Sequence, residues 1–391
     1  MKNKIIASML VAGLCVSLAA CGQKDVDKTA SAKSQQPAAT QQTITAESQQ
    51  PATAESESKD KRTITDLGGN EVEIPAVADI KRVVVISPPV MSFAVKTIPD
   101  TEMITGINSR AFTTSNAEIV NKVFPNWQSV DTSFIDASFA VNTESLLSLD
   151  PDIIFYYGNV QKQGLGNIDI PSVDFFSKGL NGPEAVSVAW DNQLREIFGL
   201  DTSGSLQKEW DRTNGKISQL LQNQNQEKTA LCIFSNAAGS ITVSGTDSFD
   251  AYAQSFFDMA GIQNAAADIE GTAEVSMEQI YQWNPDMIIV FHDAPAQKIL
   301  DNSIEGQDWS LLKAWKDKAV YDVPRTTYSW ITPCADSPML PLWLVSKAYP
   351  DLISESELKT EISEYYRRNY DITLTDGDIN SILGFRKASG S

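Results

Sequence analysis

At 391 residues the chain is too long for one ordinary hydrophobic core, so we expect two lobes. Its 50 acidic residues outnumber 31 basic ones, and this net charge of −19 argues against nucleic acid and anionic lipid surfaces as partners. A single histidine, His292, excludes a histidine-cluster metal site.

The first 20 residues have the pattern of a secretory signal peptide. Lys2 and Lys4 precede an apolar run, and small residues lead up to Cys21. The run is too short and wrongly flanked for a membrane span. The stretch Leu18-Ala19-Ala20-Cys21 resembles the lipobox of bacterial lipoproteins, which implies that Cys21 is lipidated and becomes the mature N-terminus. An ordinary signal cut nearby is the alternative. We therefore expect an extracytoplasmic protein held to the cell membrane by a lipid on Cys21.

Residues 21–61 predict a disordered tether. They are rich in Gln, Ser, Thr and Ala and contain no aromatic residue, so they cannot bury enough apolar surface to fold. A flexible coil of about 39 residues reaches roughly 35 Å.

Residues 62–182 predict an N-terminal α/β lobe. It opens with a hairpin over 62–75, marked by Gly68-Gly69-Asn70 between two alternating runs. Buried-strand runs follow at 82–86 and 104–107, and helical stretches separate the strands. This alternation indicates a mainly parallel sheet with helices on both faces.

One pattern occurs twice, at residues 142–157 and 276–291. Each copy has an N-cap residue, a Glu two positions on, apolar residues at helical spacing, a Pro-Asp stop and a buried-strand run. The two glutamates are Glu144 and Glu278. Two similar units far apart in the chain predict two similar lobes with a cleft between them.

Residues 183–227 predict the connection between the lobes. Apolar residues recur there at helical spacing, which indicates one long helix with a bend or break possible at Asn214-Gly215. A second sheet-rich lobe then covers 228–391. Its end is helical over about 338–370, with an interruption at Pro350.

Four stretches in this order resemble the helix-linked (class III) substrate-binding proteins of ABC importers, the group that captures ferric siderophores, haem and cobalamin. They are residues 64–70, 149–154, 285–289, and Tyr328-Ser329-Trp330 leading into 338–344. The resemblance implies two Rossmann-like α/β lobes with mainly parallel sheets, joined by one long α-helix, with the ligand bound in a cleft between them. It also implies a monomer that captures a ligand, performs no bond chemistry, and delivers the ligand to a permease dimer.

The cleft of such a fold lies outside the carboxyl ends of the strands. Residues that follow the predicted strands are therefore candidate ligand contacts: Ser87, Pro88, Pro89, Arg110, Tyr156, Tyr157, Asn159, Phe176, Ser235, Asn236, His292, Asp293, Arg325, Tyr328 and Trp330. Arginines, aromatic rings and amides suit a large planar or chelated ligand that is partly anionic. The alternatives are core packing for the aromatic residues and surface ion pairs for the arginines. Trp330 also matches a family-typical tryptophan beside the cleft.

Three residues have two interpretations each. His292 follows a strand and either ligates a bound iron or forms ordinary hydrogen bonds. Glu144 and Glu278 each lie in the first turn of a helix, where the macrodipole alone would favour them. The resemblance implies instead that these two glutamates dock against arginines of the permease.

The resemblance implies no resident cofactor, and it favours a ferric siderophore as the ligand, with haem or a corrinoid next and a simpler metal complex last. Cys232 and Cys334 leave a disulfide open. Enzyme motifs such as Gly-x-Ser-x-Gly are absent from the sequence. A secreted hydrolase using Ser87 and His292, and a tethered adhesin, are the distant alternatives.

Overall fold

The computed structural model describes residues 61–201, 205–246 and 252–384. All of them lie in the second of two compact units of the chain, Glu57–Ser391. The predicted signal peptide, most of the tether and the lipidation site Cys21 lie outside the described residues. Within those ranges no helix is long and apolar enough to cross a membrane.

The predicted N-terminal hairpin is confirmed. Strands β1 (Arg62–Thr65) and β2 (Glu71–Ile74) pair antiparallel. The Asp66 carboxylate accepts the backbone N–H of Asn70 at 2.7 Å, and Gly69 takes a φ of 88°. A side-chain acceptor and a glycine in the left-handed region together close the turn.

The N-terminal lobe contains a four-stranded parallel sheet in the order β4-β3-β5-β6. Its strands are β3 (Val83–Val85), β4 (Ile104–Ile107), β5 (Ile153–Tyr156) and β6 (Ser172–Asp174). Its helices are α1 (Val90–Thr97), α2 (Arg110–Thr113), α3 (Ala117–Val123), α4 (Thr143–Ser148) and α5 (Gly158–Leu165). Strands β3 and β5 are buried along their length, as their unbroken apolar runs predict.

The C-terminal lobe contains a six-stranded mixed sheet in the order β10-β8-β7-β11-β12, with β9 also paired to β7. Its strands are β7 (Lys228–Ala237), β8 (Ser240–Ser244), β9 (Ile262–Asn264), β10 (Thr272–Val275), β11 (Met287–Asp293) and β12 (Val320–Asp322). Strands β7, β11 and β12 run parallel to one another, and β8 is antiparallel to both of its neighbours, β7 and β10. Around it lie α8 (Ala253–Met259), α9 (Met277–Trp283), α10 (Ala296–Leu300) and α11 (Lys313–Lys316).

The segment between the lobes differs from the prediction, because it holds two helices instead of one. Helix α6 (Pro183–Ile197) packs against α1, and α7 (Ser205–Leu221) packs against α12. Gly199, with a φ of 62°, follows the end of α6. The Asn214-Gly215 pair, where a break was possible, lies inside α7 without interrupting it.

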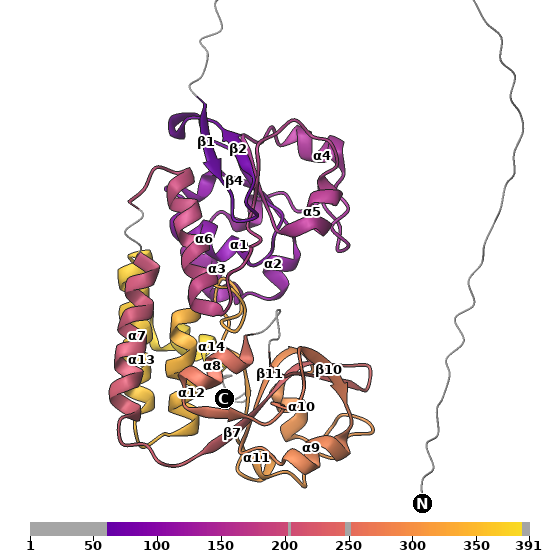
Figure 1. The fold of residues 1–391 in the computed structure, drawn as a ribbon, viewed down its shortest axis with the longest axis vertical. Helices are drawn as coiled ribbons and strands as arrows, with labels where there is room; N and C mark the ends of the chain where they lie inside the picture. The colour runs from indigo at the N-terminus through magenta and orange to yellow at the C-terminus, as the bar shows by residue number, and fades with distance from the viewer. Residues whose placement is uncertain (1–60, 202–204, 247–251, 385–391) are drawn as a thin grey trace, which may run out of the picture. The chain divides into compact units, whose positions relative to one another are not determined.

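Three helices follow the second sheet: α12 (Leu340–Ala348), α13 (Glu355–Tyr370) and α14 (Asp376–Ile382). The interruption between α12 and α13 falls at Pro350, as predicted. Figure 1 shows α13 running beside α7. Helix α14 was not predicted, and it packs against α3 of the N-terminal lobe.

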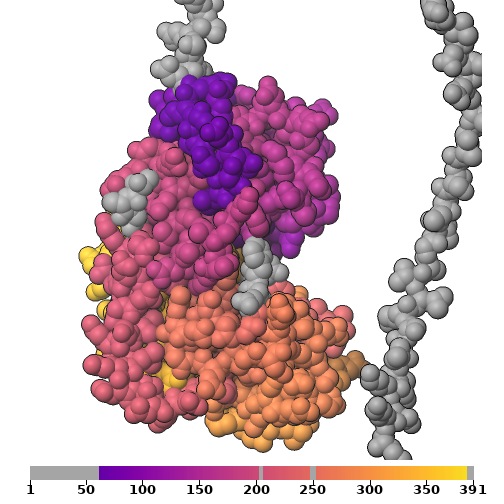
Figure 2. Space-filling view, viewed as in Figure 1, coloured from indigo at the N-terminus to yellow at the C-terminus, as the bar shows by residue number. Residues whose placement is uncertain are grey.

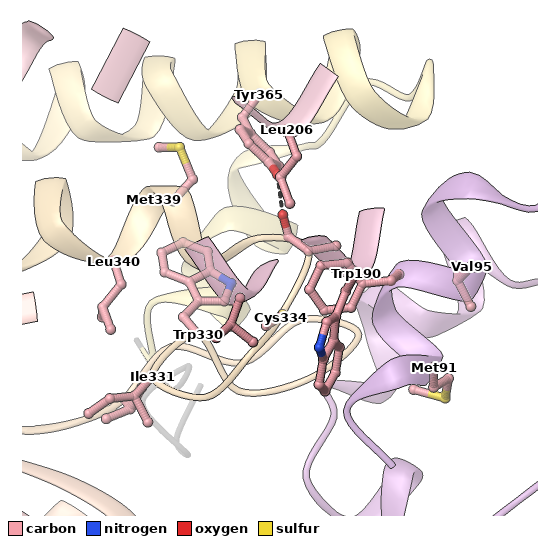
Figure 3. Packing of buried hydrophobic residues seen from close by; sticks show 14 of the residues in the cluster. Met91, Val95, Trp190, Leu206, Trp330, Ile331, Cys334, Met339, Leu340 and Tyr365 are labelled. Atoms are coloured by element: carbon pink, nitrogen blue, oxygen red, sulfur yellow. Dashed lines mark hydrogen bonds between the residues drawn. The ribbon is translucent and has the colours of Figure 1, made fainter. Parts of the chain in front are cut away.

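The largest hydrophobic core includes residues from both sheets and from the helices that join them. Trp190 of α6, Trp330, Cys334 and Tyr365 of α13 all belong to this core (Figure 3). The Tyr365 hydroxyl donates to the carbonyl of Ala335, and the Ala335 N–H donates to the Ser92 hydroxyl of α1 at 3.1 Å. The lobes are therefore joined by shared packing as well as by the chain.

Candidate functional site

The site is built at the ends of the parallel strands. Arg110 begins the helix that follows β4, and its backbone N–H donates to the Asn108 side chain at 3.0 Å. His292 and Asp293 end β11, and Arg325 follows β12. In the space-filling view the two lobes, magenta above and orange below, meet across a hollow at one edge (Figure 2).

Three cationic or potentially cationic side chains, one from the N-terminal lobe and two from the C-terminal lobe, share an electrostatic environment. Arg110 is exposed, whereas His292 and Arg325 are half-buried. The Arg325 guanidinium donates to the Phe291 carbonyl, and Arg110 lies 5.3 Å from the centre of the Phe139 ring. We call Arg110, His292 and Arg325 the cationic cluster.

Burial lowers the pKa of His292, and the positive charges of Arg325 and Arg110 lower it further, against an opposing effect of Asp293. The imidazole is therefore neutral at pH 7. A neutral ring keeps one acceptor nitrogen, so His292 offers both a donor and an acceptor to a ligand. The two arginines supply the fixed positive charge of the cluster.

Tyr328, in the loop after β12 of the C-terminal lobe, contacts the N-terminal lobe beside the cationic cluster. Burial raises the pKa of the Tyr328 phenol. The hydrogen bond with the Thr114 side chain and the positive charges of Arg110 and Arg325 act in the opposite direction and lower this pKa. Beside it, the Asn116 N–H donates to the Thr326 carbonyl at 2.7 Å. The loop after β12 is thus fixed against the loop before α3.

A cavity of about 860 Å³ adjoins the cluster and includes His292 and Arg325 in its wall. The N-terminal lobe contributes residues 115–118, and the C-terminal lobe contributes residues 290–295 and the end of β12. The remaining wall is α14 with the residues that flank it, from Thr375 to Gly384. Its volume falls in the range of sites that hold drug-sized ligands.

The other predicted contacts divide by exposure. Asn159 and Phe176 are exposed, and Pro89, Tyr157 and Ser235 are half-buried, so these residues stay available to a ligand. Tyr157 and Phe176 pack edge to face at 5.6 Å. Neither ring lines the cavity.

Five of the predicted contacts have buried side chains: Ser87, Pro88, Tyr156, Asn236 and Trp330. Asn236 exchanges two side-chain hydrogen bonds of 2.9 Å with Gln307. The Trp330 indole is fully buried and donates to the Thr326 hydroxyl at 3.0 Å. Burial leaves these side chains little surface for a ligand in this conformation.

The matched glutamates lie on corresponding helices of the two lobes. Glu144 on α4 and Glu278 on α9 are both exposed in the first turn. The pKa of Glu278 is lowered, first by a backbone hydrogen bond at its own N–H and then by the Ser276 hydroxyl. Both side chains are therefore accessible to a partner.

Cys232 and Cys334 are both buried and both free, so no disulfide joins them. Burial raises the pKa of the Cys232 thiol to about 12. Within the described ranges there is also no group of three or more metal-binding side chains.

Sequence reasoning missed two walls of the cavity, the start of α3 and the whole of α14. The signal for α14 is a capping box: the Thr375 hydroxyl accepts the Asp378 N–H at 3.2 Å, and the Asp378 carboxylate accepts the Thr375 N–H at 2.7 Å. The pair Thr375-x-x-Asp378 is visible in the sequence as a helix start.

Two α/β lobes, each with its own sheet, and a ligand-sized cavity lined by residues of both lobes define the architecture of a solute-binding protein. A family model described as periplasmic binding protein matches residues 128–327, half of the chain, so the chain belongs to that family. Proteins of this family bind small ligands and work with ABC permeases outside the cytoplasm, and they are not enzymes.

Known relatives fit this assignment. The chain is 26% identical to the molybdate-binding protein MolA of Haemophilus influenzae over 79% of this chain and 91% of that protein. It is 26% identical to the Fe(3+)-citrate-binding protein YfmC of Bacillus subtilis over 70% and 82%. A periplasmic solute-binding protein of Veillonella parvula shares its fold with a TM-score of 0.72 and 27% identity, over 83% of this chain and 98% of that one.

Proposed function

We propose that the protein is a lipid-anchored, monomeric solute-binding component of an ABC importer that captures an anionic iron chelate, with a ferric siderophore as the first candidate. The observation that carries this proposal is the cavity wall formed by His292 and Arg325 of the C-terminal lobe, with Arg110 of the N-terminal lobe near enough to lower the pKa of His292. Guanidinium groups bind carboxylates and related oxygen donors through paired hydrogen bonds. A chelate held between the lobes would satisfy both arginines at once.

The size of the cavity favours a chelate over a single small oxyanion. About 860 Å³ suits a ligand of drug-like dimensions, whereas a tetrahedral oxyanion would leave most of that space to water. A simple ferric carboxylate, the kind of ligand named for the Bacillus subtilis relative, is the smaller member of this class.

A molybdate-type oxyanion is the second candidate. It is favoured by the Haemophilus influenzae relative, which aligns over most of both chains. Haem and corrinoids are further alternatives, for which two arginines would hold propionate or phosphate groups.

A thermal-shift panel distinguishes these ligands. The purified protein is mixed with ferric enterobactin, an anionic tris-catecholate siderophore, and with ferric citrate, haem, cobalamin and sodium molybdate, with the iron-free chelators as controls. A ligand at a hundred times its Kd stabilises the folded state by about 2.7 kcal/mol, which raises Tm by several degrees. The proposal requires a shift with a ferric chelate and none with its iron-free form. No shift with any ferric chelate would refute it.

We further propose that Glu144 and Glu278 are the contacts with the permease. Their exposure and their matching places on α4 and α9 suit a partner with two equivalent basic sites. Since this role concerns delivery, it is separable from ligand binding.

A further inference from the structure

The exposed side chain of Arg110 is held by one short loop of its own lobe. Its guanidinium carbon lies 5.3 Å from the centre of the Phe139 ring, within the range of a cation–π contact. Its Nη1 donates to the Ala137 carbonyl at 3.4 Å. Both contacts come from residues 136–140, which we call the Phe139 loop. Together they restrict a side chain that would otherwise sample many rotamers.

The Phe139 loop has a fixed shape. The Asp136 carboxylate accepts the N–H groups of Ser138 at 2.8 Å and of Ala140 at 3.0 Å, and the Asp136 N–H donates to the Ala140 carbonyl at 3.1 Å. At the base of the loop, Ile135 and Val141 form an antiparallel bridge. Ile135 is buried in a hydrophobic core of the N-terminal lobe, and Val141 packs against it. The loop is therefore a rigid support for Arg110.

The place of the loop against α5 depends on a glycine. A Cβ added at Gly164 would lie 2.0 Å from the Phe139 carbonyl oxygen, so only glycine permits this close approach. The Phe139 side chain is half-buried and packs against the same core as Val141. Phe139 thus has a core contact on α5's side of the lobe and a cation–π contact with Arg110.

The backbone of Phe139 is strained. Its φ of 66° lies in the left-handed region, which is unfavourable for an aromatic residue. Such conformations persist only where the surrounding structure imposes them, and they cluster at functional sites. The contact with Arg110 identifies the function that this strained conformation would serve.

We propose that Phe139 is a positioning residue for ligand binding, which holds the Arg110 guanidinium ready for an anionic group of the ligand. This inference rests on the proposed function and adds the residue that prepares one of its two arginines. A side chain already restricted loses less conformational freedom on binding. A cation–π contact uses no N–H donor, so the guanidinium keeps donors for a ligand oxygen besides the one bonded to Ala137.

The test compares two replacements that both keep a Cβ and a large side chain. Phe139→Tyr keeps the aromatic face, whereas Phe139→Leu keeps apolar bulk and loses that face. Kd for ferric enterobactin and for ferric citrate is measured by tryptophan fluorescence in the full-length protein. Phe139→Leu is expected to bind about two- to fivefold more weakly, the effect of one exposed cation–π contact, and Phe139→Tyr is expected to bind like the wild type.

The same measurements in the Arg110→Ala background separate positioning from direct contact. If Phe139 acts through Arg110, Phe139→Leu has no further effect once Arg110 is removed. A ring that stacks on the ligand itself would give the same loss in both backgrounds, which would overturn the inference. Wild-type affinity in Phe139→Leu would overturn it as well, and so would equal losses in Phe139→Leu and Phe139→Tyr.

Failure of the proposed function gives a different result. Wild-type affinity in Arg110→Ala, or no binding of either ferric chelate by the wild type, contradicts the proposed function and this inference together. Weakened binding in Arg110→Ala with wild-type affinity in Phe139→Leu contradicts this inference alone. Thermal unfolding of each variant shows whether it is folded. If Phe139→Leu does not fold, Phe139→Met takes its place, since it also fills the space without an aromatic face.

Discussion

The side-chain amide of Asn116 donates to the hydroxyl of Ser381, 265 positions further along the chain, across 3.1 Å. The same side chain caps α3 by accepting the Glu118 N–H at 3.0 Å. One residue therefore both starts a helix of the N-terminal lobe and holds the last described helix of the chain against it.

Replacements at Asn116 and Ser381 separate the capping of α3 from the link between α3 and α14. Asn116→Ser keeps a capping group and loses the link, whereas Asn116→Ala loses both. We expect Ser381→Ala and Asn116→Ser each to lower the free energy of unfolding by up to about 1 kcal/mol, and Asn116→Ala to lower it by about 1 kcal/mol more. Urea unfolding checks this. Equal losses in Asn116→Ala and Asn116→Ser would show that the cap contributes nothing.

Asp336 gives a pH dependence of stability. Its carboxylate is fully buried, and burial raises its pKa despite hydrogen bonds from Thr326, Tyr366 and Tyr370. A carboxyl whose pKa is raised by folding stabilises the folded state below its unfolded pKa, and that contribution is lost as pH rises. The wild type should therefore lose stability relative to the Asp336→Asn variant as the pH rises from 4 to 7. Urea titrations across that range test it, and a shift toward the wild type would count against a raised pKa.

His292 gives a pH dependence of binding. Because its pKa is lowered, the imidazole gains its charge only below its ordinary value of 6.5. The wild type should therefore bind an anionic chelate increasingly better than His292→Gln as pH falls from 6.5 to 5. Comparing the two proteins at each pH cancels the titration of the ligand itself. A ratio of affinities that stays constant would place His292 away from the ligand's charge.

The docking proposal separates delivery from capture. The double variant Glu144→Ala with Glu278→Ala should keep the wild-type Kd for ligand and lose most uptake in cells that carry the permease. Replacing the exposed glutamates Glu102 and Glu355 instead provides a charge-matched control that should transport normally. Normal uptake by the docking variant, or a weakened Kd, would refute the role of the two glutamates.

Much of the fold was predictable because it depends on local patterns. The apolar runs that became β3 and β5, the Gly-Gly-Asn turn and the doubled helix-turn-strand unit all specify their structure over short distances. The break between α6 and α7 was missed because Phe198 and Leu200 continue the apolar pattern on both sides of Gly199.

The site was predictable only in part. Strand ends located Arg110, His292 and Arg325, because parallel strands present their carboxyl ends at one edge. They could not reveal which way a side chain turns. Trp330 follows a strand like the others, yet its indole donates to Thr326 and lies in the core. Helix α14 comes from a part of the chain remote from every strand end, so only the three-dimensional structure brings it to the cavity.

The central claim, that arginines from both lobes bind one anionic ligand, is tested most directly by a double-mutant cycle on Arg110→Ala and Arg325→Ala. Kd for the ferric chelate that gives the largest thermal shift is measured by tryptophan fluorescence in all four proteins. We expect each single variant to bind at least tenfold more weakly, since a charge-assisted hydrogen bond contributes about 1.5–3 kcal/mol. We also expect the double variant to lose less than the sum, because both arginines hold the same ligand. Wild-type affinity in both single variants would contradict the claim.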